Sequence, residues 1–129
     1  MKFTQYLVIL FLCLAGSCNA QQSHDAHYPD IPGISATVLI KTTKAWNGAV
    51  LPEYGSGQPE INIIRYQFSP GSSIPMHMHP VINAGVLLQG ELTVTTKSGQ
   101  TVQLKAGDPL VELFKEWYFG ANSGSEVAD

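Results

Sequence analysis

Short stretches of β-forming residues, separated by tight turns, constrain the fold of this chain more than any other feature. Each of the turns 69–72, 97–100 and 105–108 contains a glycine, and the first also a proline, where a reversal requires them. No helical periodicity appears after residue 20, and several segments alternate apolar and polar residues. The pattern predicts an all-β domain, either an antiparallel sandwich or a small barrel. The expected strands are 34–42, 61–68, 84–88, 91–96, 101–104 and 109–114.

One segment of this pattern carries a pair of histidines. His77 and His79 lie two residues apart between two prolines. Residues at i and i+2 of an extended strand share a face, so we expect both imidazoles to point the same way and Met76 and Met78 to pack on the other side. Two imidazoles that converge from one strand form half of a transition-metal site.

Residues 1–20 have the pattern of a secretory signal peptide. Lys2 supplies the positive charge, an uncharged apolar run follows over Tyr6–Leu14, and small residues precede a cleavage site after Ala20. The apolar run is shorter than the roughly 20 residues of a membrane span. A retained anchor and lipid attachment at Cys18, which ends an imperfect lipobox, remain alternatives. We expect the protein to be secreted or periplasmic, without membrane attachment unless Cys18 is lipidated.

The rest of the chain is short, acidic and without cysteine. Cleavage after residue 20 would remove Cys13 and Cys18, so the mature chain would have neither a disulfide nor a catalytic thiol. Six basic residues would then stand against ten acidic ones, with no basic cluster, which argues against nucleic acid or anionic membranes as partners. Residues 21–33 are expected to form a polar arm, and residues 34–129 a single domain.

The spacing around the histidine pair resembles the first motif of the cupin superfamily. That motif runs Gly, five residues, His-x-His, three or four residues, Glu, six residues, Gly. Gly71, His77, His79 and Gly90 fall on this spacing, and Asn83 occupies the position of the Glu. The resemblance covers residues 34–128 and is to small, single-domain, secreted bacterial cupins.

The second cupin motif is matched less completely. It runs Gly, five residues, Pro-x-Gly, two residues, His, three residues, Asn. Gly107 and Asn122 fit it, whereas Leu113 and Lys115 replace the Pro and the Gly, and Tyr118 replaces the His.

The resemblance implies a double-stranded β-helix, the cupin or jelly-roll barrel, with a metal inside. Carried over by position, the metal ligands are His77, His79, Asn83 and Tyr118. The metal would be a divalent ion such as Fe, Mn, Zn, Ni or Cu, held weakly, because an amide is uncharged and a phenol has a pKa of about 10. The alternative is that the two histidines contact a ligand and no metal is bound.

The expected function is that of a small exported cupin that binds a small molecule in its barrel. With a weakly held metal it would have dioxygenase- or isomerase-like activity; the alternative is a non-enzymatic binding or sensing module with a metal-free pocket. No catalytic residue is assigned, since Glu91 and Asp108 are interpreted as a solvated strand residue and a turn residue.

The residues after Asn122 are too few for a further strand, so the barrel is expected to lack its last strand. An uncovered edge of that kind favours pairing with a second copy as a homodimer.

Overall fold

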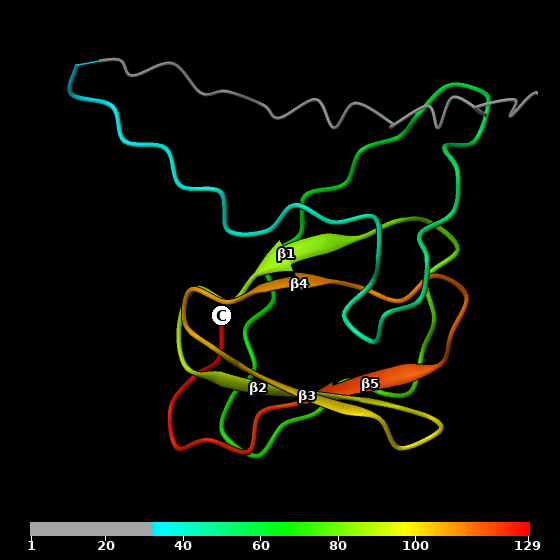
Figure 1. The fold of residues 1–129 in the computed structure, drawn as a ribbon. Helices are drawn as coiled ribbons and strands as arrows, with labels where there is room; N and C mark the ends of the chain where they lie inside the picture. The colour runs from blue at the N-terminus through cyan, green and yellow to red at the C-terminus, as the bar shows by residue number, and fades with distance from the viewer. Residues whose placement is uncertain (1–31) are drawn as a thin grey trace, which may run out of the picture. The chain divides into compact units, whose positions relative to one another are not determined.

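The structure of the protein is a computed structural model that describes residues 32–129 (Figure 1). None of these residues is helical, so the described part of the chain contains no helix that could cross a membrane. The all-β prediction is confirmed. The five strands are β1 (Ala84–Val86), β2 (Glu91–Thr96), β3 (Thr101–Lys105), β4 (Pro109–Val111) and β5 (Tyr118–Ala121).

The strands form two antiparallel sheets. One contains β1 and β4, and the other has the order β3-β2-β5. The histidine segment bridges both sheets, because His77 pairs with Tyr118 of β5 and His79 pairs with Phe114, just after β4. The turn 97–100 joins β2 to β3 in the expected hairpin, in which Val94 lies opposite Val102.

The core lies between these sheets. Alternation along β2 buries Val94 to 2% exposure and leaves Glu91 in solvent, as the sequence pattern predicts for a half-buried strand. Leu113 is 1% exposed, although it replaces the proline of the second motif. The buried cluster consists of Ala45, Leu87, Val94, Leu104, Leu110, Leu113, Tyr118 and Ala128.

The segment after β5 closes one end of the core. Residues 123–129 form no strand, but Ala128 pairs with Phe68 and is fully buried. The buried Asn122 side chain holds this segment in place: its Nδ2 donates to the carbonyls of Phe68 and Glu126 at 2.8 and 2.7 Å, and its Oδ1 accepts from Gly124 N. The second-motif asparagine therefore has a structural role.

Two expected strands are absent, and this part of the prediction was wrong. Segment 34–42 has no strand, and segment 61–68 contributes only the isolated bridge at Phe68. Both segments have β-forming residues, but within residues 32–129 neither has any strand pairing apart from the Phe68–Ala128 bridge. Ile61 and Ile63 are 83% and 96% exposed. Strand propensity reflects packing against neighbours, so it cannot form a strand where no neighbour is present.

Two further expectations, on the packing of Met76 and Met78 and on the length of strand 109–114, were also wrong. Met76 and Met78 are 41% and 46% exposed, so neither is packed into the core. Trp46 packs against the core, but Tyr54 is 96% exposed in its loop. The strand expected over 109–114 ends at Val111, because the chain turns away to meet His79.

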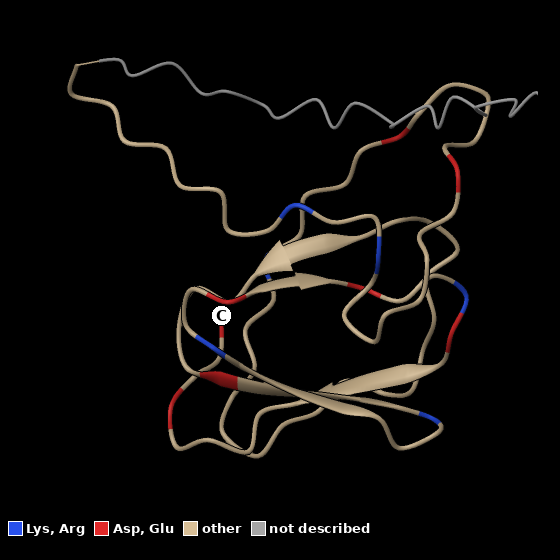
Figure 2. Cartoon of the chain, in the orientation of Figure 1, with Lys and Arg blue, Asp and Glu red and all other residues tan. Residues whose placement is uncertain are grey.

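One long stretch of the chain has no charged residues. Between Arg65 and Glu91 there is no Lys, Arg, Asp or Glu, and β1 accordingly carries no charge in Figure 2. Arg65 itself forms an ion pair with Asp129, which fixes the end of segment 61–68 to the last residue. The hydrogen bond from the Arg65 guanidinium lowers the pKa of the Asp129 carboxyl.

Residues 37–129 form one compact unit, which contains all five strands and the core. The expected signal peptide, residues 1–20, and most of the expected polar arm, residues 21–33, lie outside the described residues.

Candidate functional site

Backbone pairing brings His77 and Tyr118 together. His77 N donates to Tyr118 O at 2.9 Å, and Tyr118 N donates to His77 O at 3.0 Å. Their rings are 4.7 Å apart between centroids. The His79 ring lies 5.0 Å from that of His77 and 5.7 Å from that of Tyr118. Three of the four residues expected as metal ligands therefore lie side by side.

A backbone carbonyl orients the His77 ring. Nδ1 of His77 lies 2.8 Å from Pro75 O. A carbonyl oxygen only accepts hydrogen bonds, so Nδ1 carries the proton and Nε2 of the neutral ring is left with its lone pair. Metal-binding histidines are commonly oriented by such a contact. The same tautomer also suits an imidazole that accepts a hydrogen bond from a ligand.

Glu112 is a charged member of the site that the sequence analysis did not identify. Its Oε2 lies 3.0 Å from Nε2 of His79, and the two side chains are 26% and 25% exposed. Glu112 follows directly after β4 and precedes Phe114, which pairs with His79. We call His77, His79, Glu112 and Tyr118 the histidine cluster.

The Tyr118 hydroxyl is buried and makes no hydrogen bond of normal geometry within residues 32–129, although the Glu112 carboxylate lies near it. Burial raises the pKa of Tyr118 far above its usual value, and the negative charge of the nearby Glu112 carboxylate raises it further. Tyr118 is therefore a neutral phenol in this structure. The resemblance implies Tyr118 as a metal ligand. To bind as a phenolate, Tyr118 would have to lose its proton although burial and the Glu112 charge both oppose ionisation.

Asn83 contributes its backbone to the site. Its carbonyl accepts from Glu112 N at 3.0 Å, whereas its side chain makes no hydrogen bond with another described residue. The register Ala84↔Val111 continues by one residue at this point, so Asn83 and Glu112 lie directly opposite each other. The role of Asn83 as a metal ligand stays a prediction.

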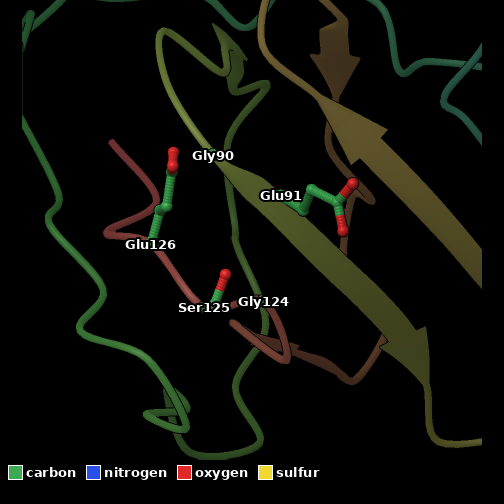
Figure 3. Close-up of a pocket in the computed structure, with 5 residues that line it drawn as sticks. All are labelled: Gly90, Glu91, Gly124, Ser125 and Glu126. Atoms are coloured by element: carbon green, nitrogen blue, oxygen red, sulfur yellow. The ribbon is translucent and has the colours of Figure 1, made fainter.

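A separate open pocket of about 290 Å³ lies at the other end of β2 (Figure 3). It is lined by Gly90, Glu91, Gly124, Ser125 and Glu126. The two carboxylates extend in different directions in Figure 3, so they do not form a converging acid pair. Gly90 has φ 76°, and a Cβ there would lie 2.5 Å from Val127 O, which accounts for the glycine at this motif position.

The fold and the cluster together define an all-β barrel protein with two histidines from one segment facing a tyrosine. A family model of the cupin domain (Cupin_2) matches residues 64–128, about half of the chain, and this range contains the whole histidine cluster. The chain belongs to the cupin family. No curated protein sequence matches it.

The donor atoms of the histidine cluster are of the types that bind divalent metals. Two imidazoles and a carboxylate are a common donor set for divalent transition metals, and the Pro75 contact leaves Nε2 of His77 available. Among residues 32–129, however, no three His, Cys, Asp or Glu side chains already converge on one point.

Proposed function

We propose that the protein binds a small molecule inside its barrel, at the histidine cluster. The observation that carries this proposal is the buried Tyr118 hydroxyl: the tyrosine ring lies beside two imidazoles, and the hydroxyl makes no hydrogen bond of normal geometry among the described residues. A buried donor without a partner costs about 1–3 kcal/mol. A ligand with an acceptor oxygen or nitrogen would offset that cost by accepting a hydrogen bond from the Tyr118 hydroxyl. The Nε2 lone pair of His77 would accept a hydrogen bond from a donor group of the same ligand.

A divalent metal is the finer part of this proposal. Bound by His77, His79 and Glu112, it would supply Lewis-acid polarisation of a ligand oxygen. The protein would then have dioxygenase- or isomerase-like activity. The buried, neutral Tyr118 hydroxyl would orient the ligand by donating a hydrogen bond.

The second candidate function is a binding or sensing module that works without metal. The contact between His79 and Glu112 favours it, because the Glu112 carboxylate already lies against Nε2 of His79. Metal analysis of protein purified without a histidine tag separates the two functions. Bound Fe, Mn, Zn, Cu or Ni close to one equivalent per chain supports the metal-dependent function. Less than a tenth of an equivalent of every metal, also after reloading, leaves the metal-free module.

Substitution of Tyr118→Phe tests small-molecule binding itself. A panel of small carboxylates, sugars and phenols is screened by thermal shift, and the affinity of each hit is measured by calorimetry. The variant should bind hits roughly 5- to 30-fold more weakly, since one hydrogen bond is worth about 1–2 kcal/mol. Without ligand it should be at least as stable as the original protein, because the substitution removes the cost of burying the hydroxyl. Loss of stability with unchanged affinity, or a panel without hits and without metal, would contradict the proposal.

The proposal also includes export of the protein and its association with a second copy. The pattern of residues 1–20 supports a secreted or periplasmic location, which reporter fusion to the first 20 residues can test. The exposed apolar residues of segment 61–66 support association with a second copy of the chain.

A further inference from the structure

Besides the Tyr118 hydroxyl, the described part of the chain has a second buried donor without a partner, the indole Nε1 of Trp46. It is shielded from solvent and makes no hydrogen bond of normal geometry within residues 32–129. Trp46 packs against the buried core cluster to which Tyr118 belongs. An indole N–H can only donate, so it needs an acceptor. Buried polar groups without a partner are few in natural proteins, and each calls for an explanation.

The turn that carries Trp46, residues 45–49, lies along the connection from β4 to β5. Trp46 N donates to the carbonyl of Val111, the last residue of β4, at 3.1 Å. Asn47 Nδ2 donates to Oε2 of Glu116, near the other end of the connection, at 2.9 Å. The acidic member of the histidine cluster follows directly after β4, and the phenolic member is the first residue of β5. The turn is therefore fixed beside that cluster.

The histidine cluster has one carboxylate but no Lys or Arg. The Glu112 carboxylate is partly buried, with Oε2 3.0 Å from Nε2 of His79, and lies near the Tyr118 hydroxyl. A carboxylate ligand that accepted a hydrogen bond from Tyr118 would lie close to Glu112 and be repelled by it. An uncharged ligand avoids this repulsion, and its carbonyl oxygens still accept hydrogen bonds.

We propose that Trp46 and Tyr118 are the two hydrogen-bond donors of the barrel site, and that this site selects uncharged carbonyl compounds over carboxylates. This inference rests on the proposed function, because it names the ligand class of the same site. The Nε2 lone pair of His77 and the Glu112 carboxylate accept hydrogen bonds. A primary amide therefore matches the site on both sides: its oxygens accept from the two buried donors, and its N–H groups donate to the two acceptors.

The first test compares two pairs of probes that differ in charge but little in shape, malonamide with malonate and succinamide with succinate. Each is titrated into isotope-labelled, tag-free protein, and the indole N–H signals of the two tryptophans are followed by NMR. The spectrum of Trp117→Phe assigns the two signals. The Trp46 signal should shift with at least one amide, whereas that of Trp117, which is 45% exposed, should stay in place. That amide should bind roughly tenfold or more tightly than its carboxylate.

The second test removes the indole donor. Trp46→Phe should weaken amide binding by roughly 3- to 10-fold, since one neutral hydrogen bond is lost. Trp117→Phe is the matched control and should bind as the original protein does. If Trp46→Phe does not fold, the Trp46 signal of the original protein decides alone.

The possible results separate this inference from the proposed function. Unchanged affinity in Trp46→Phe, or a Trp46 signal that does not move, would overturn the role of Trp46. Carboxylates that bind as tightly as the amides would overturn the selectivity. Small-molecule binding stands in each of these cases. If neither amide binds, the inference is overturned as a whole, and the thermal-shift panel with Tyr118→Phe still decides the proposed function.

Discussion

Lys115 has a backbone conformation that lysine seldom adopts. Its φ is 54°, and it occupies the position of a glycine in the second cupin motif. Its N–H donates to His79 O at 2.8 Å, so the strained turn also fixes the histidine segment. We predict that Lys115→Gly increases the free energy of unfolding by about 0.5–1 kcal/mol, because left-handed backbone costs a side-chain-bearing residue more than it costs glycine. Urea denaturation measures this change.

Lys115→Ala is the matched control for this prediction. It removes the contact of the Lys115 ammonium with the Phe114 ring, 5.0 Å from the centroid, but keeps the strain. The alanine variant should therefore be slightly less stable than the original protein. Equal stability of the alanine and glycine variants would show that backbone strain at this position is negligible.

At the scale of elements, the sequence predicted strands where β1 to β4 lie, missed β5, and predicted strands over 34–42 and 61–68 that the structure does not contain. The alternation over 91–96 gave β2 residue for residue, and β3 extends one residue beyond its expected end. Segments 34–42 and 61–68 have equally strong β-forming residues, but a strand depends on partners that local sequence does not specify. Glu112 was missed for the same reason: its closeness to His79 follows from the pairing of β1 with β4, and no sequence spacing reveals it.

The segment after β5 depends on one side chain. Asn122 makes three hydrogen bonds with backbone groups and is 1% exposed. We predict that Asn122→Ala lowers the free energy of unfolding by about 2–4 kcal/mol, because buried backbone groups lose their partners. Asn62→Ala is the control, since Asn62 is exposed and makes a single side-chain contact with Glu60. A loss below about 1 kcal/mol in urea denaturation would show that water replaces Asn122 at these groups.

At the scale of the whole molecule, apolar surface and missing strand neighbours occur together. Ile61, Ile63 and Ile64 are 62–96% exposed in an extended segment, while Val86 and Leu88 are 40% and 66% exposed at β1 and just after it. Natural sheets protect free edges with charged residues, and the chain between Arg65 and Glu91 has none. The same chain therefore has both an apolar segment without strand pairing and a sheet edge without charged residues. In a symmetric dimer, the apolar segment of each copy can pack against the sheet edge of the other.

We therefore predict a dimer that depends on segment 61–66. Size-exclusion chromatography with light scattering should give twice the mass of one chain at micromolar concentration. Ile63→Lys should give the mass of a monomer, because a charge on this segment opposes its burial against a second copy. Since Ile63 is 96% exposed within its own chain, the substitution removes no internal packing and each folded subunit should persist. Tyr54→Lys, at an equally exposed position in the loop 44–59, should remain dimeric. A monomeric original protein, or an Ile63→Lys variant that stays dimeric, would show that this segment is not the interface.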